Sequence, residues 1–105
     1  MSKSEKIVEQ YLVSRIKAIG GKSYKWRAVD HKGVPDRICI LPWMGVFFVE
    51  LKRLGKNPTA LQLKTFEDIK RAGGIVFVAR GKEGVDILIN YVIDLNPDNE
   101  KLPTK

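Results

Sequence analysis

Cysteine and histidine are almost absent from this chain of 105 residues, which has one of each. A lone thiol cannot close an internal disulfide, and Cys39 lies in an apolar run, so we expect it to be reduced and buried. Structural zinc sites draw most of their four ligands from cysteine and histidine, so one of each is too few. These two shortages exclude the small domains that disulfides or zinc hold together.

Long apolar stretches are missing as well. The longest, Met44 to Val49, includes a glycine and falls far short of the roughly 20 apolar residues that a helix needs to cross a bilayer. The first five residues, Met1 to Glu5, lack the apolar segment of a secretory signal. We therefore expect a cytoplasmic protein with no membrane partner.

Length and composition indicate one globular domain. The chain is 44% hydrophobic and 30% charged, and a length near 100 residues suits one compact core better than two. We place this domain at residues 1–95 and expect the polar, proline-containing stretch 96–105 to be a flexible tail. Nineteen Lys and Arg against twelve Asp and Glu give a net charge of +7. That excess suits contact with phosphate backbones, although it also aids solubility and favours anionic membranes.

The spacing of apolar residues predicts seven elements. Helices are expected over about 2–19, 59–72 and 82–91, where apolar residues recur every three or four positions. Strands are expected over 24–29, 37–41, 46–52 and 75–79. The unbroken run 75–79 is typical of a strand buried on both faces. The order α-β-β-β-α-β-α predicts an α/β fold, a mixed four-stranded sheet with helices packed on it.

A short loop between the second and third strands brings two acidic residues together. Three loop residues, 42–44, set a register that places Asp36 opposite Glu50. Opposed Cβ atoms lie about 4.5 to 5.5 Å apart, so the two carboxylates could share one cation, since Mg²⁺ bonds oxygen at about 2.0 to 2.1 Å. Lys52 points to the same face as Glu50, because side chains alternate along a strand.

The chemistry of this group favours a metal site. Asp36 and Glu50 repel each other, and partial burial raises the cost, whereas a divalent cation resolves the conflict and leaves room for a phosphate oxygen and an attacking water. The Lys52 ammonium could neutralise charge in the transition state or orient the water. Glu50 and Lys52 alone would suggest a solvated strand face, and Pro35-Asp36 an ordinary strand entry. The combination of these residues on neighbouring strands favours the metal site over those two ordinary interpretations.

Three motifs carry a resemblance to a known family: Gly33-Val34-Pro35-Asp36, Glu50-Leu51-Lys52 and Gln62. Together, over about residues 7–89, they resemble the signature of the VRR-NUC (virus-type replication-repair nuclease) domain, a branch of the PD-(D/E)XK nuclease superfamily. The resemblance implies an αβββαβ core, dependence on Mg²⁺ or Mn²⁺, and hydrolysis of phosphodiester bonds in DNA. Stand-alone members resemble phage proteins that act as homodimers on branched DNA, including four-way (Holliday) junctions. A phage-encoded chain would work in the host cytoplasm.

The resemblance also implies roles for individual residues. Asp36 and Glu50 match the metal-binding acids, and Lys52 matches the catalytic lysine. Gln62 matches an active-site glutamine, although with Thr59 it can also close a capping box.

A helix glutamate and a backbone carbonyl complete the implied metal set. Glu9 best fits the family pattern and borders the apolar face of its helix. Glu5, about 40° away on the helical wheel, is the reserve candidate. Val49 matches an apolar position whose carbonyl commonly completes the metal shell.

Basic residues gather around the first strand and the loop before Asp36, where they could hold a DNA backbone. They are Lys22, Lys25, Arg27, Lys32 and Arg37. His31 in the same loop has no partner at metal-ligand spacing and suggests a solvated residue, with a phosphate contact as the lesser alternative. Trp43 and Met44 at the hairpin tip are expected to be exposed and to suit a dimer contact or a wedge against DNA.

These observations predict a metal-dependent endodeoxyribonuclease of DNA repair or recombination that selects branched DNA and acts as a homodimer. Two alternatives stay open at this point. One is an inactive nuclease-fold module that recruits partner proteins to DNA junctions, and the other is a nuclease directed at RNA. The choice between four-way junction and flap, the cut position, the physiological metal and the dimer surface are also open.

Overall fold

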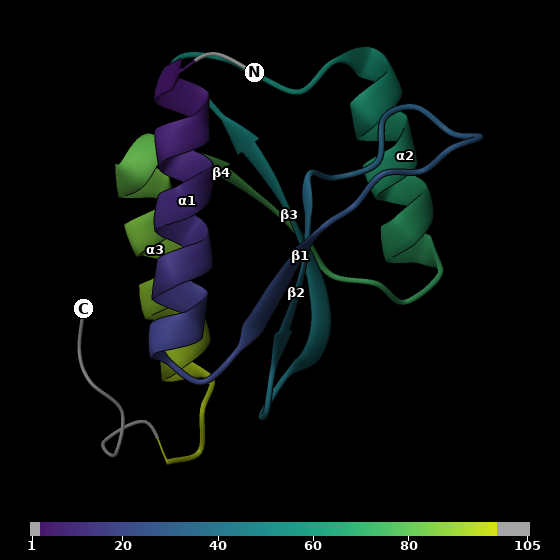
Figure 1. Ribbon diagram of the computed structural model, residues 1–105. Helices are drawn as coiled ribbons and strands as arrows, with labels where there is room; N and C mark the ends of the chain where they lie inside the picture. Colours follow the sequence, from purple (N-terminus) through teal and green to yellow (C-terminus); the bar gives the residue numbers. More distant parts are fainter. Residues whose placement is uncertain (1–2, 99–105) are drawn as a thin grey trace.

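The computed structural model describes residues 3–98 and shows seven elements in the predicted order (Figure 1). They are α1 (Lys3–Ala18), β1 (Lys22–Lys25), β2 (Arg37–Leu41), β3 (Gly45–Lys52), α2 (Ala60–Arg71), β4 (Val76–Arg80) and α3 (Gly81–Asp94). The predicted α/β fold class and αβββαβ core are therefore confirmed. Ser2, the first residue of the first predicted helix, and residues 99–105 of the expected tail lie outside the described residues.

The four strands form one mixed sheet in the order β1-β2-β3-β4. β2 is antiparallel to both β1 and β3, and β4 runs parallel to β3 after the crossover through α2. Leu41 pairs with Gly45 across the loop 42–44, which is the predicted register. The ladder ends with Arg37 opposite Val49. The next position of each strand, residue 36 and residue 50, continues the same alignment.

Helices cover both faces of the sheet (Figure 1). α1 and α3 pack side by side on one face, and α2 lies on the other. The apolar core lies between the sheet and the α1/α3 pair, and its fully buried members include Leu12, Ile16, Phe47, Val85 and Ile89. Burying each such side chain contributes about 1.5 to 3 kcal/mol. This face therefore supplies most of the apolar stabilisation, and it also holds Cys39, which is buried as predicted.

Strand β3 divides its side chains between the two faces, because neighbouring residues of a strand point to opposite sides. Phe47, Val49 and Leu51 enter the core beneath α1 and α3. Glu50 and Lys52 point to the face that α2 covers, where Glu50 meets a side chain of that helix. One strand thus serves both the core and the polar group that the sequence singles out.

The first strand is shorter than predicted and lies earlier in the chain. β1 covers Lys22–Lys25, whereas the period-two spacing predicted residues 24–29. Trp26 still continues the pairing, because its backbone N–H donates to the carbonyl of Asp36 at 3.0 Å. Beyond it the chain leaves the sheet and reaches α2 at Gly33. The alternation in residues 26–29 therefore belongs mostly to a loop.

The last strand lies at the sheet edge, so the expectation of burial on both faces is wrong. Within residues 3–98, β4 pairs with β3 alone. Val76, Phe77 and Val78 consequently stay half-buried. The apolar run reflects pairing with β3 and packing against α3, which begins at Gly81 and extends three residues beyond its predicted end. None of the helices in this described range is long and apolar enough to cross a membrane.

The hairpin tip is packed against the core, and the expectation that it is exposed is wrong. Trp43 and Met44 are half-buried beside the core residues. The indole Nε1 of Trp43 donates to the carbonyl of Val92 in α3 at 2.7 Å. An aromatic ring whose polar end is satisfied in this way belongs to the packing of the domain.

Candidate active site

Gly33 sets the path of the chain into the candidate site. Its φ is +90°, and a Cβ atom there would lie 2.9 Å from the hydroxyl oxygen of Thr65 and 3.2 Å from Leu61, both in α2. Glycine avoids both the strained backbone and the clash, so the loop can pack on α2. Pro35 is fully buried directly after this contact. The loop therefore enters β2 at a fixed position, and Asp36 is the residue directly before that strand.

Asp36 and Glu50 lie on adjacent strands in the predicted alignment. The backbone N–H of Leu51 donates to the Asp36 carboxylate oxygen Oδ2 at 2.9 Å, which ties this side chain to β3 beside Glu50. Their negative charges are close enough for Asp36 to raise the pKa of Glu50. Asp36 and Glu50 are therefore neighbours, and their role as a metal-binding pair stays a prediction.

Glu50 is a buried carboxylate with incomplete hydrogen bonding. The residue is 2% exposed. Its Oε2 accepts from Gln62 Nε2 at 3.0 Å and lies 3.2 Å from Lys52 Nζ. Its Oε1 is buried and makes no hydrogen bond of normal length and angle to a described residue, although the backbone N–H of Asp36 lies close enough to this carboxyl group to lower its pKa. Burying an unpaired carboxylate oxygen is costly.

Burial and like charge perturb the titration of both acids. Burial, followed by the charge of Asp36, raises the pKa of Glu50 to about 7, although Lys52 acts in the opposite direction. Burial is also the main reason why the pKa of Asp36 is raised, with a further contribution from the charge of Glu9. The Leu51 amide opposes that rise. Two carboxyl groups that resist ionisation side by side are a common feature of functional sites.

Gln62 makes both of the contacts that the sequence left as alternatives. In the capping box of α2, its backbone N–H donates to Thr59 Oγ1 at 3.1 Å, and its side-chain Oε1 accepts from the Thr59 backbone N–H at 2.9 Å. The remaining end of the amide, Nε2, donates to Glu50. The cap therefore fixes the amide so that its donor points at the carboxylate.

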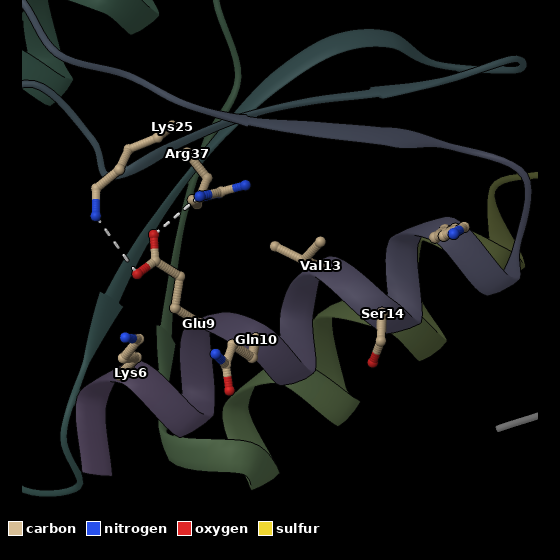
Figure 2. A pocket seen from close by; sticks show the side chains of 8 residues that line it. Lys6, Glu9, Gln10, Val13, Ser14, Lys25 and Arg37 are labelled. Atoms are coloured by element: carbon tan, nitrogen blue, oxygen red, sulfur yellow. Dashed lines mark hydrogen bonds and ion pairs between the residues drawn. The ribbon is translucent and has the colours of Figure 1, made fainter. Parts of the chain in front are cut away.

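Glu9 lies on α1 and points at two cations, Lys25 and Arg37 (Figure 2). The residue is 6% exposed. Its Oε2 lies 3.0 Å from Arg37 Nη1, and its Oε1 lies 3.7 Å from Lys25 Nζ. The three side chains line a pocket of about 340 Å³ between α1 and the first two strands. The charge of Glu9 reaches Asp36 and contributes to its raised pKa.

The donor set fits a single divalent cation at the hairpin. Throughout residues 3–98, no three His, Cys, Asp or Glu side chains gather as a metal-binding group. The candidate ligands are therefore the pair Asp36 and Glu50, and Mg²⁺ commonly binds through one or two carboxylates and several waters. The unpartnered Oε1 of Glu50 is the observation that favours a cation, because a cation would satisfy it. The metal roles of Glu9 and the Val49 carbonyl stay predictions.

Known proteins resemble the chain along most of its length, although no family model matches it. "Putative nuclease p44" of Acyrthosiphon pisum secondary endosymbiont phage 1 is 37% identical over 84 residues, which are 80% of this chain and 90% of that protein. A solved structure of a VRR_NUC domain has a TM-score of 0.79 and 34% identity, and the match covers 86% of this chain and 98% of that one. The chain belongs to the VRR_NUC family. The predicted resemblance is confirmed.

A second solved structure, of a VRR_NUC domain protein, has a TM-score of 0.72 at 18% identity. The match covers 91% of this chain and 93% of the other, and it shows the fold alone. Membership of the family and the name of the phage relative together support a nuclease.

The basic residues expected to hold DNA divide into two groups in this VRR_NUC domain. Four are exposed on β1 and the following loop: Lys22, Lys25, Arg27 and Lys32. Arg37 is different, because its side chain is 12% exposed and fully engaged. Besides Glu9, it donates from Nε to Ser23 Oγ at 3.1 Å and from Nη2 to the Ser23 carbonyl at 3.2 Å. Its place opposite the core residue Val49 is the sequence signal that could have indicated this.

Trp26 is the neighbour of the site that sequence reasoning missed. It continues the β1–β2 ladder opposite Asp36, and its ring packs on Phe48 with centroids 5.0 Å apart. The pairing of Lys25 with Arg37 would have revealed this position had β1 been placed correctly. His31 lies in the following loop and is exposed, as predicted, with its Nε2 3.1 Å from Thr65 Oγ1.

Proposed function

We propose that this VRR_NUC domain is an endodeoxyribonuclease that depends on Mg²⁺ or Mn²⁺ and hydrolyses phosphodiester bonds. The observation that carries the proposal is the buried Glu50 carboxylate, which has an unpartnered oxygen, a pKa of about 7 and Asp36 beside it. Such a group destabilises the metal-free protein and is stabilised by a cation. The nuclease name of the phage relative supports the same activity.

Asp36 and Glu50 would hold the cation, with the Val49 carbonyl and Glu9 as supporting groups. A divalent cation bound there supplies Lewis-acid stabilisation of the phosphate and lowers the pKa of a coordinated water. At neutral pH the Glu50 carboxyl is about half protonated without a cation, since its pKa is about 7. Binding of the cation therefore requires Glu50 to release a proton to solvent.

Lys52 and Gln62 have separate tasks in the proposed reaction. The Lys52 ammonium lies 3.2 Å from Glu50 Oε2, and its side chain is 19% exposed, so it can also reach a bound phosphate. There it would stabilise the negative charge that grows in the transition state. Gln62 donates to the same carboxylate oxygen and is a positioning residue for Glu50.

The proposed substrate is branched DNA, either a four-way junction or a flap, and the proposed active form is a homodimer with two sites for two strands. The exposed cations of the β1 region, Lys22, Lys25, Arg27 and Lys32, would hold the phosphate backbone. The net charge of +7 supports attraction to DNA without sequence preference. Arg37 contributes indirectly, because it is committed to Glu9 and Ser23.

A cleavage panel tests the proposal. Linear duplex, flap, splayed arm and four-way junction are each incubated with Mg²⁺ or Mn²⁺ and with wild type, Asp36→Asn or Lys52→Ala. Asp94→Asn, which changes an exposed carboxylate on α3, is the matched control. We expect cleavage of branched DNA by wild type and by the control, and none by the two site variants. Retained cleavage in a site variant contradicts the assignment. DNA binding without cleavage by wild type would indicate the inactive module.

A further inference from the structure

A second pocket lies beside the carboxylate pair on the α2 face of the sheet. It has a volume of about 570 Å³ and opens between α2 and the loop that follows β1. Its apolar side includes Trp26, Val34 and Ile69, and its polar side includes His31 and Thr65. This volume falls within the range of about 300 to 1,000 Å³ that is typical of small-molecule sites. The pocket is therefore large enough for one nucleobase.

The sheet register places this pocket next to the proposed cleavage site. Trp26 lies opposite Asp36, since its backbone N–H donates to the Asp36 carbonyl at 3.0 Å. Asp36 in turn lies opposite Glu50 in the continued β2–β3 alignment. Neighbouring strands are about 4.7 to 4.9 Å apart. The three side chains thus form a row on one face, and the tryptophan is one strand away from Asp36 and two strands away from Glu50.

The ring of Trp26 is held in place by packing against its neighbours. Its ring packs on Phe48 with centroids 5.0 Å apart and planes inclined by 35°. Phe48 is anchored on β3 between Phe47 and Val49, which are both fully buried. Aromatic side chains held beside a phosphate site are a common means of binding unpaired bases, because every base has a π-face.

The charge of the pocket selects against a phosphate group. Asp30 and Asp68 line it, and none of its lining residues within 3–98 is Lys or Arg, although the chain as a whole carries a net charge of +7. Two carboxylates repel an anion, but they accept hydrogen bonds from the amino groups of bases. The buried hydroxyl of Thr65, 3.1 Å from His31 Nε2, adds a further polar group to the lining. The lining therefore favours a neutral base over the DNA backbone.

We infer that this pocket receives an unpaired nucleobase of the strand whose phosphate lies at Asp36 and Glu50. The inference rests on the proposed nuclease function and narrows its substrate to DNA that has a single-stranded nucleotide next to the cut. A fully paired duplex keeps its bases stacked, and extruding one of them costs free energy. Flaps and splayed arms already offer an unpaired base. The pocket thus gives a physical reason for selecting branched DNA.

Binding to abasic DNA tests the inference without relying on cleavage. Splayed-arm DNA is prepared intact and with one abasic nucleotide at each position around the branch, and its affinity for the full chain is measured by fluorescence anisotropy without divalent metal. Stacking on one aromatic side chain corresponds to about 5- to 150-fold in affinity. We expect wild type to lose that factor at one abasic position. Trp26→Ala should lose the same factor on intact DNA and lose nothing further at that position.

Three more variants keep the test decisive. Trp26→Phe retains an aromatic ring against Phe48 and should recover most of the affinity lost by Trp26→Ala, which guards against a folding defect. Trp43→Phe, in the packed hairpin tip, is the matched control and should respond to the abasic position as wild type does. Asp68→Asn should reduce any preference for a cytosine over a thymine at that position.

Several results would overturn the inference. If Trp26→Ala and the abasic nucleotide each lower the affinity and their factors multiply when combined, the side chain and the base act independently. The absence of an effect at every abasic position would show that no base enters the pocket. An equal gain by Asp68→Asn on intact and abasic DNA would indicate a phosphate instead. If the effects of Trp26→Ala and of one abasic position are coupled but the protein cleaves no substrate, the base pocket is supported and the proposed nuclease activity is contradicted.

Discussion

Glu9 and Glu50 are both buried glutamates near the same hairpin, yet their surroundings are opposite. Glu9 is 6% exposed, and each of its carboxylate oxygens faces a different cation, Arg37 or Lys25. Glu50 is 2% exposed, shares one oxygen between Lys52 and Gln62, and leaves the other without a partner in the described chain, beside Asp36. The first carboxylate joins α1 to the sheet. The second is left incomplete, which a cation would correct.

The difference follows from which face of the sheet each residue meets. Arg37 points toward α1 because it lies opposite the core residue Val49, so it neutralises the glutamate on that helix. Glu50 lies on the α2 face together with a second acid. Burial with a like charge opposes the ionisation of Glu50, whereas the charge of Glu9 is compensated by two ion pairs. The two carboxylates therefore differ in charge compensation, which the following substitutions test.

Substitution of the incomplete carboxylate should have the largest effect, and it should appear in catalysis. Glu50→Gln and Lys52→Ala should each reduce cleavage of branched DNA by at least about 100-fold, because the first removes a proposed ligand of the cation and the second removes the ammonium that would act on the phosphate. Glu9→Gln should reduce it by about 10-fold, because Glu9 only supports the metal site. Single-turnover cleavage rates of the three variants, at the Mn²⁺ concentration that saturates wild type, measure these losses. Equal losses in Glu9→Gln and Glu50→Gln would remove the proposed distinction.

Breaking the satisfied pair should instead reduce stability. Arg37→Met leaves the buried Glu9 with only Lys25 at 3.7 Å. Removing one partner of a buried ion pair costs about 3 to 5 kcal/mol, since the remaining charge is uncompensated. The free energy of unfolding in urea measures this loss. Lys70→Met, at an exposed pair with Glu67 on α2, is the control and should change it by less than about 1 kcal/mol. An equally small effect at Arg37 would show that Glu9 does not depend on it.

Neutralising the incomplete carboxylate should stabilise the metal-free protein above neutral pH. The pKa of Glu50 is about 7 in the fold against 4.5 as its ordinary value, so the folded state holds its proton more tightly and wild type loses stability as pH rises through that interval. Glu50→Gln avoids this loss and should be more stable at pH 8 by about 2 to 3 kcal/mol. Below pH 5 the free energies of unfolding of wild type and Glu50→Gln should converge. Unfolding curves with chelator across pH 4.5 to 8 measure it, and a variant less stable at pH 8 would contradict the account.

Gln62 and Thr59 give the smallest effects and separate capping from the site. Thr59→Ala and Gln62→Ala should each cost about 1 kcal/mol of stability, because both open the capping box of α2. Only Gln62→Ala removes the hydrogen bond to Glu50, so it alone should weaken Mn²⁺ binding, by about 10-fold. Thermal melts and metal titrations of both variants measure this. Equal Mn²⁺ affinity in Thr59→Ala and Gln62→Ala would show that Gln62 serves only to cap α2.

The sequence predicted the part of the site that local geometry determines. A three-residue loop and the period of two along a strand fix the hairpin register, so the alignment of Asp36 with Glu50 follows from residue spacing alone. The capping box of α2 was visible for the same reason. Each of these depends on residues within about fifteen positions of one another.

Features that depend on distant contacts were wrong or missed. The expected first strand was placed late because the contact of Gly33 with Thr65, which draws the loop away from the sheet, leaves no periodic signal. Arg37 was assigned to DNA because its charge was evident and its buried partner on α1 was not. The edge position of β4 depends on the strand order, which an apolar run cannot reveal.

Calorimetric titration of the metal-free protein with Mn²⁺ tests the central claim most directly. At pH 8 we expect one ion per chain, bound mainly by Asp36 and Glu50. Affinity should be lower at pH 6, with more protons released per ion, because the pKa of Glu50 is about 7. Asp36→Asn and Glu50→Gln should each abolish the binding heat, while Asp94→Asn retains it. No heat in wild type, or unchanged binding in either site variant, would contradict the account.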